Sequence, residues 1–144
     1  RSAQPSRGDL ERWVSGSGIR SVINLRGEHV GTAWYDEELA ASARLGIAHY
    51  DFSMSAGKAL PQSRAAELVE LLRAAPKPVL IHCKSGADRT GLASALLLST
   101  LGQDEDAAEA QISFRYGHIS IPHTAAWPMD QSWEALEPWL GYIS

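Results

Sequence analysis

The chain has 144 residues, of which 44% are hydrophobic and 21% are charged, so it is long enough to bury the core of one globular domain. Its formal charge of −4 excludes a general attraction to nucleic acid or to an anionic membrane surface, and its single cysteine excludes an internal disulfide. No apolar run approaches the roughly 18 residues that a membrane-spanning helix needs. Because the sequence starts at Arg1, a removed leader or anchor would not be visible, and both a cytoplasmic and a periplasmic location stay open.

Short apolar runs alternate with segments of helical periodicity along the chain. The runs that predict buried strands are 21–25, 47–52 and 76–82. The segments that predict helices are 9–18, 34–46, 61–75, 90–102, 104–118 and 129–143. We expect Asp9 to cap the first helix, Gly18 to end it, and Pro61 to stand near the start of the third.

This alternation predicts the fold. It favours an α/β single domain over 1–144, with a central, mostly parallel sheet of four to five strands and helices on both faces. A C-terminal helical segment, about 119–144, is expected to pack on this domain through Trp127, Trp133 and Trp139. In such sheets, ligands bind beyond the carboxyl ends of the strands. The stretch HCKSGADRTG follows the third strand and is therefore the candidate site.

The stretch HCKSGADRTG sets a cysteine, a glycine-containing turn and an arginine between a strand and a helix. Gly86 permits backbone angles that a side chain would oppose, so the loop amides can converge on one anion at the start of the helix. Arg89 adds a planar guanidinium that can hold two phosphate oxygens. Cys83 would then lie beneath a phosphate site where its thiolate is favoured, as a nucleophile toward phosphorus. The alternative is that Cys83 is a small buried hydrophobic residue.

From residue 82, the pattern His-Cys-x-x-Gly-x-x-Arg-Thr resembles the signature loop of cysteine-based protein tyrosine phosphatases, especially bacterial dual-specificity-like ones. RSAQPS, SVINLR and the helix before the loop extend the likeness over most of residues 1–115, but not to the tail after His118. The resemblance implies the dual-specificity phosphatase fold and a covalent mechanism without a metal or other cofactor.

The resemblance also implies a role for each residue of the loop. Cys83 would be the nucleophile that forms a phosphocysteine intermediate, and the Thr90 hydroxyl would ease departure of its thiolate in the second step. His82 would orient the loop through hydrogen bonds, or is simply a satisfied histidine at a strand end. The phosphoryl group would be held by the Arg89 side chain and by the loop amides of Lys84, Ser85, Gly86, Ala87, Asp88 and Arg89.

The leaving group needs a proton, which a carboxylic acid usually supplies, and two aspartates compete for this role. Asp51 lies 32 residues before Cys83, a spacing similar to that of the general-acid loop in dual-specificity phosphatases, but it falls within the second predicted strand. Asp88 stands where myotubularin-like and some bacterial tyrosine phosphatases carry an aspartate with the acid role. A bound phosphate dianion should help Asp88 keep its proton, because a like charge disfavours the ionised form. The sequence therefore favours Asp88, with helix capping or pairing with a lysine as its alternative role.

These residues predict a phosphomonoester hydrolase acting on a phosphorylated protein or a small phosphoester. An inositol-phosphate or phosphoinositide phosphatase is a subclass that Lys84 favours, whereas Ala87, where such enzymes often carry a second lysine, argues against it. A phosphate-binding module with little turnover is another class, because SMSAGKALP holds no carboxylate. A rhodanese-like sulfurtransferase is a third, against which the Arg-Thr pair after the loop argues. The natural substrate and the oligomeric state stay open.

Three residues outside the loop also have alternatives. Arg26 is expected at the same sheet edge, where it either pairs with Glu28 or lines the pocket. His118 and His123 have no partner cysteine or carboxylate cluster, so they are interpreted as core or solvated histidines and no metal site is predicted.

Overall fold

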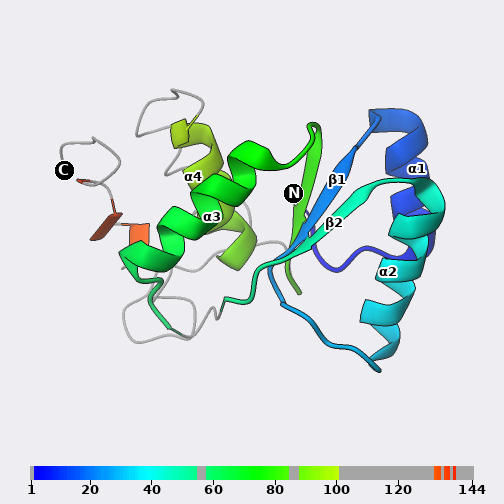
Figure 1. The fold of residues 1–144 in the computed structure, drawn as a ribbon, viewed down its shortest axis with the longest axis horizontal. Helices are drawn as coiled ribbons and strands as arrows, with labels where there is room; N and C mark the ends of the chain where they lie inside the picture. The colour runs from blue at the N-terminus through cyan, green and yellow to red at the C-terminus, as the bar shows by residue number, and fades with distance from the viewer. Residues whose placement is uncertain are drawn as a thin grey trace.

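The computed structural model describes residues 2–54, 58–84 and 88–100, together with 132–133, 135–136 and 138 of the C-terminal segment. Within them the elements follow in the order α1 (Arg7–Ser17), β1 (Ser21–Asn24), α2 (Ala33–Leu45), β2 (Ala48–Asp51), α3 (Gln62–Ala74), β3 (Val79–His82) and α4 (Asp88–Thr100). Helices α1 and α2 lie on one side of the sheet, and α3 and α4 on the other (Figure 1). None of these helices is long and apolar enough to cross a membrane, as far as the described residues extend.

The three strands form one parallel sheet in the order β2-β1-β3. In the central strand, Ser21 pairs with Ala48 of β2 and with Val79 of β3. Each connection between strands contains a helix, as crossovers between parallel strands require. The prediction of an α/β domain with a parallel sheet between helices is confirmed, and the described residues contain three strands of the four to five expected.

The helix ends follow from local sequence. Ser6 is the N-cap of α1: its side chain accepts from the Asp9 amide, and the Asp9 carboxylate accepts from the Ser6 amide, which makes a capping box. The expectation that Asp9 itself is the cap is therefore wrong, because its carboxylate completes the box from the third helical position. Gly18 and Gly46 end α1 and α2 in the left-handed conformation, at φ of 67° and 70°. Pro61 stands at the N-cap of α3, as expected.

The two faces of the sheet bury separate cores. Side chains along a strand alternate between faces, so Ile23 and Ile81 contribute to the core on the α3–α4 face, while Val22 and Leu80 contribute to the one on the α1–α2 face. The α3–α4 core is the larger of the two. Its fully buried helix residues include Leu68, Leu72, Leu92 and Leu96.

Part of the C-terminal segment lies on the larger core. Trp133 and Leu136 are each 2% exposed and belong to that core. The Leu60 amide donates to the Ser132 hydroxyl at 2.7 Å, which ties this segment to the connection before α3. The packing of the whole C-terminal segment stays a prediction. Outside the described residues lie Trp127, Trp139 and the helix expected over 104–118.

Candidate active site

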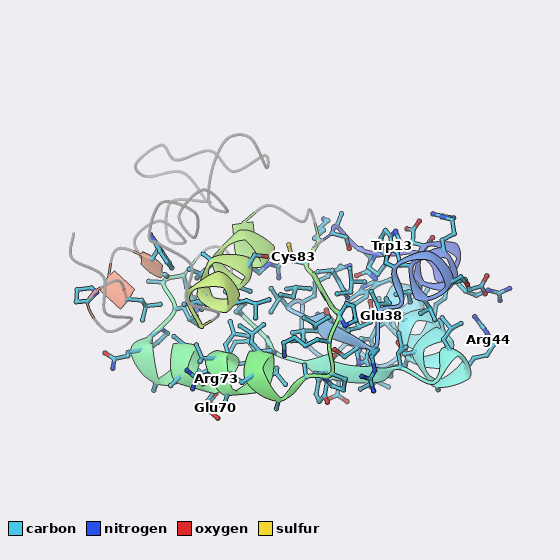
Figure 2. The ribbon with its side chains drawn as sticks, turned by 90° about the horizontal axis from the view of Figure 1, so that it is seen from above. Trp13, Glu38, Arg44, Glu70, Arg73 and Cys83 are labelled. Carbon is cyan, nitrogen blue, oxygen red and sulfur yellow. The ribbon has the colours of Figure 1, made fainter. Side chains whose placement is uncertain are left out.

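Cys83 follows directly on β3, at the carboxyl edge of the sheet. The alternation of β3 turns its side chain to the α3–α4 face, where it shares a core with Ile81 and is 1% exposed. Figure 2 shows its sulfur at the end of the strand, beside α4. This burial fits both predicted roles, a nucleophile at the floor of a site and a small core residue. Outside the described residues lie Ser85, Gly86 and Ala87, whose amides are predicted to bind phosphate.

Arg89 lies in the first turn of α4, which begins at Asp88 rather than at the predicted Thr90. Its half-buried guanidinium donates from Nη1 to the carbonyl of Met54 at 3.3 Å, in the connection between β2 and α3. A helix N-terminus with a guanidinium in its first turn favours an anion, so this edge of the sheet suits a phosphate. The side chains of Asp88 and Thr90 lie outside the described residues, and their roles stay predictions.

Arg26 follows β1 and lies at the same edge of the sheet. Its Nη1 donates to Gln4 Oε1 at 2.9 Å, and its guanidinium carbon lies 3.7 Å from the centre of the Trp34 ring. A guanidinium over an aromatic face is a favourable cation–π arrangement. The partners that the structure gives Arg26 are therefore Gln4 and Trp34, and not the expected Glu28, within the part of the chain that is described.

The charges around Arg26 connect it to the cysteine loop. Burial, followed by repulsion from Arg89, lowers the pKa of Arg26, while the negative charges of Glu38 and Cys83 act in the opposite direction. The charges of Arg89 and of a Cys83 thiolate would thus both act on Arg26. Positive charge near a thiol favours the thiolate, and it also favours an incoming phosphate dianion.

The segment before α1 runs alongside β3 and the first residue of the loop. The Ser2 amide donates to the Ile81 carbonyl at 3.0 Å, and Ser2 also forms a parallel bridge with His82. The Gln4 amide donates to the carbonyl of Lys84 at 3.3 Å. The N-terminal segment therefore fixes the backbone immediately after Cys83, while the Lys84 side chain is exposed.

Asp51 ends β2, and both of its carboxylate oxygens accept hydrogen bonds. The Tyr35 hydroxyl donates to Oδ2 at 2.5 Å, and Asn24 Nδ2 donates to Oδ1 at 3.0 Å. Burial, together with the bond to Asp51, raises the pKa of Tyr35, which keeps its hydroxyl protonated as a donor. Through these contacts the Asp51 side chain joins the ends of β1 and β2 to α2. Its role as general acid stays a prediction.

Glu38 is a fully buried carboxylate on α2 that the sequence analysis did not single out. Its Oε2 lies 2.5 Å from His49 Nε2, and its Oε1 lies 2.9 Å from Gln4 Nε2 and 2.7 Å from His82 Nε2. The His82 contact has the distance of an ion pair, although its N–H is not aligned for a regular hydrogen bond. Burial alone would raise the pKa of Glu38, but the bonds from His49, His82 and Gln4 and the charge of His82 outweigh it and lower that pKa to about 2.

His82 lies between this carboxylate and the candidate nucleophile. It is completely buried, and its Nδ1 lies 3.4 Å from the backbone carbonyl oxygen of Cys83. Figure 2 shows Glu38 between α2 and the sheet, on the other side of the strands from the Cys83 sulfur. The ring of His82 thus reaches from the buried acid to the backbone of the cysteine.

Two sequence patterns would have identified Glu38. Within α2, Tyr35, Glu38 and Ala41 recur at three-residue spacing and are all buried, so a glutamate stands in the middle of the core-facing stripe. Within β2, His49 and Asp51 are two residues apart and therefore share one face of the sheet. A charged residue on a buried helical stripe needs polar partners, and this strand provides them.

The described residues contain no group of three or more histidine, cysteine, aspartate or glutamate side chains arranged to hold a metal ion. His118 and His123 lie outside the described part of the chain. Two surface hollows, of about 340 and 300 Å³, border Ile19 near the amino ends of the strands, at the opposite edge of the sheet from Cys83.

Residues 1–111 match the model of the Tyrosine phosphatase family. The chain belongs to this family. The matched region includes the N-terminal segment, the whole sheet and the HCKSGADRTG loop, so the family predicted from that loop is confirmed.

Individual relatives agree with this assignment. Over 63 residues, 44% of this chain and 22% of the relative, the sequence is 49% identical to the triple specificity protein phosphatase PtpB of Mycobacterium tuberculosis. The chain thus matches about a fifth of the length of the curated relatives. The core catalytic domain of the PP-IP phosphatase SIW14 from S. cerevisiae has the same fold, with a TM-score of 0.67 at 20% identity over 92% of this chain and 78% of that one. TpbA of P. aeruginosa, solved in complex with pTyr, has a TM-score of 0.64 at 19% identity over 98% and 84%.

Proposed function

We propose that this protein is a phosphomonoester hydrolase that forms a phosphocysteine intermediate on Cys83. In the first step, the Cys83 thiolate forms the S–P bond while the P–O ester bond breaks, and the leaving oxygen takes a proton from the general acid. In the second step, water attacks phosphorus, the S–P bond breaks, and phosphate leaves with the thiolate restored. Arg89 holds the phosphoryl oxygens in both steps.

The observation that carries this proposal is the arrangement of Cys83 and Arg89 on consecutive elements at one sheet edge. Cys83 ends the strand, and Arg89 stands in the first turn of the helix that follows, where the helix dipole also favours negative charge. Arg26, after β1, adds a second guanidinium at this sheet edge, and its positive charge would favour a thiolate on Cys83. A buried thiol with this surrounding charge is easier to ionise than an isolated core cysteine.

We assign the general acid to Asp88 rather than to Asp51. The two oxygens of Asp51 are bound by Tyr35 and Asn24, which supports a structural role. Asp88 is the first residue of α4 and directly precedes Arg89, so it belongs to the loop end that would surround the phosphoryl group.

For the substrate, we propose phosphotyrosine or a small aryl phosphoester. The relatives with pTyr and protein phosphatase in their names motivate this class. Inositol phosphates are the second candidate, because the exposed Lys84 and the guanidinium of Arg26 stand near the loop and would suit a substrate with several phosphates. Phosphate release from a phosphotyrosyl peptide and from an inositol polyphosphate, compared at equal concentration, separates the two classes.

The test is hydrolysis of 4-nitrophenyl phosphate, which has a good leaving group, and of phenyl phosphate, which has a poor one. Cys83→Ser should abolish both activities, because a serine hydroxyl is not ionised at neutral pH. Asp88→Asn should reduce kcat on phenyl phosphate by about 100-fold and on the nitrophenyl ester far less, because only the poor leaving group needs the proton.

Asp36→Asn is the matched control, since Asp36 is an exposed aspartate in the first turn of α2. It should leave both activities unchanged. A loss confined to phenyl phosphate in Asp51→Asn would move the acid role to Asp51. Phosphate binding without any turnover in the parent protein would overturn the hydrolase and support a phosphate-binding module.

A further inference from the structure

The connection between β2 and α3 begins with a short segment, 52–54, that is fixed to the end of β1. The Phe52 amide donates to the Asn24 carbonyl at 3.0 Å. The Met54 amide donates to the Leu25 carbonyl at 3.4 Å. The side chains of Phe52 and Met54 are both buried in the α3–α4 core. The backbone of this segment is therefore held at the carboxyl edge of the sheet.

Arg64, in the first turn of α3, also contacts the 52–54 segment. Its Nη2 donates to the Ser53 carbonyl at 2.8 Å, and its guanidinium carbon lies 4.1 Å from the centre of the Phe52 ring. Its Nη1 pairs with Glu67 on the same helix. These contacts use both terminal nitrogens and one face of a planar group, so they fix the guanidinium against the segment.

Arg89 is bound to the same segment. Its Nη1 donates to the Met54 carbonyl at 3.3 Å. A guanidinium has its five N–H donors in one plane, and it holds a phosphate through two neighbouring donors at once. When Nη1 donates to a fixed carbonyl, that plane is set, and the edge formed by Nε and Nη2 is left for two oxygens of an anion. The position of the Met54 carbonyl therefore determines how Arg89 faces the phosphate.

We propose that Arg64 is a positioning residue, which fixes Arg89 through the backbone of the 52–54 segment in the orientation that receives the phosphoryl group. The inference deepens the proposed function and rests on it for the role of Arg89. The contacts lead from Arg64 to the Ser53 carbonyl, through one peptide unit to the Met54 carbonyl, and from there to Arg89. A guanidinium that is already oriented loses less conformational freedom when the anion binds.

The charge of Arg64 is not the source of this effect. Its side chain is 41% exposed and its charge is paired with Glu67, so solvent and the carboxylate both screen it. A direct attraction between Arg64 and a phosphate is therefore weak. The expected contribution comes from the hydrogen bond to the Ser53 carbonyl and from the contact with the Phe52 ring.

Binding of tungstate, a tetrahedral dianion that resembles phosphate, measures the anion site without any turnover. Arg64→Met keeps a long apolar side chain beside the Phe52 ring but removes the donor to the Ser53 carbonyl. Since one hydrogen bond of the orienting set is lost, the dissociation constant for tungstate should rise by about fivefold. Isothermal titration calorimetry measures this constant.

Arg73→Met is the matched control. Arg73 lies on the same helix and pairs with Glu70 three residues away, as Arg64 pairs with Glu67. Among the described residues, the contacts of the Arg73 side chain do not include the 52–54 segment. Its replacement removes the same kind of surface ion pair, so the dissociation constant for tungstate should equal that of the parent.

A second background tests whether the effect passes through Arg89. In Arg89→Lys, the anion is held by an ammonium group, which acts as a point charge and has no plane to be fixed. The further change Arg64→Met should then no longer weaken tungstate binding. A loss that persists in this background would mean that Arg64 acts on the anion by another route, and it would overturn the proposal.

Equal dissociation constants for the parent and for folded Arg64→Met would also overturn it. A parent protein that binds no tungstate would overturn the inference, whether or not it hydrolyses an aryl phosphate. A parent protein that binds tungstate but hydrolyses no aryl phosphate would refute the proposed function alone, and the same titrations would still decide the role of Arg64.

Discussion

The end of β3 has different surroundings on the two faces of the sheet. On the α3–α4 face, Ile81 and Cys83 pack in an apolar core among the leucines of α3 and α4. On the α1–α2 face, Leu80 is apolar, but the next residue on that face, His82, meets the ionised Glu38. The same short strand therefore ends in an apolar environment on one side and beside a buried carboxylate on the other.

This difference shows that two kinds of interaction fix the position of the buried cysteine. Packing is non-directional, and on the α3–α4 face it holds the sulfur in place, while apolar burial by itself disfavours the thiolate. Hydrogen bonds and ion pairs are directional, and on the α1–α2 face they act on the backbone of Cys83 through His82. The stabilisation from each face is thus expected to depend on different residues, which can be changed separately.

The largest expected effect on stability comes from the apolar face. Leu72 is fully buried in the α3–α4 core, so Leu72→Ala should lower the free energy of unfolding by about 3 kcal/mol, through lost burial and a cavity. Urea unfolding measures this. Val30→Ala is the control, since Val30 is 72% exposed and its truncation should change stability by less than about 0.5 kcal/mol. If Leu72→Ala also removes the pH dependence of stability that Glu38 is expected to cause, the two faces are not independent.

On the α1–α2 face, the contribution of Glu38 to the free energy of unfolding should depend on pH. The pKa of Glu38 is lowered from 4.5 to about 2 in the folded state, so its ionisation stabilises the fold above about pH 4.5, and this stabilisation is lost as pH falls toward 2. Glu38→Gln should therefore be less stable than the parent at pH 7 by on the order of 3 kcal/mol, and the gap should close between pH 4.5 and 2. Unfolding curves at several pH values measure it. A gap that does not depend on pH would mean that the loss comes from packing alone.

A smaller effect on stability is expected for Gly27, which lies in the turn after β1 and approaches Ser53. Gly27 has φ of 81°, and a Cβ built on it would lie 2.8 Å from Ser53 Cβ, so Gly27→Ala combines backbone strain with a steric clash. We expect it to cost about 2 kcal/mol. Gly31→Ala is the matched control: its φ is 90°, but a Cβ there meets nothing within 4 Å, so only strain of about 1 kcal/mol is expected. Equal losses in thermal unfolding would show that Ser53 moves aside.

The smallest expected effect concerns the bond from Tyr35 to Asp51. Tyr35→Phe removes one partly buried hydrogen bond to a carboxylate and should lower stability by about 1–2 kcal/mol. In a double-mutant cycle with Asp51→Ala, the two losses should be less than additive, because both remove the same bond. Full additivity would contradict the structural role given to Asp51 and return it to consideration as the acid.

Local patterns predicted the elements and the loop, because both depend on neighbours in sequence. The helical period of 61–75 and the apolar run before Cys83 are sufficient for α3 and β3, and the loop motif, with the likeness around it, predicted the family that the match over residues 1–111 confirms. The residue at which a helix begins was harder to predict, because a carboxylate such as Asp9 suits several positions of the first turn equally well.

The polar network was missed because its members are far apart in the chain. Gln4 and Glu38 are separated by 34 residues, and only the β2-β1-β3 order brings His49 and His82 to the same face as Glu38. Each residue alone is an ordinary polar side chain in a sequence. The pairing of a glutamate on a buried helical stripe with alternating polar residues on a strand is visible only when the two elements are considered together.

The contacts of the N-terminal segment affect where a purification tag can be attached. Ser2 and Gln4 donate their amides to the end of β3 and to Lys84, and the Gln4 side chain also contacts Arg26 and Glu38. A purification tag joined ahead of Ser2 would thus lie beside the segment that leads from β3 into the cysteine loop. A bulky or adhesive tag at that point is expected to distort measurements of the turnover rate.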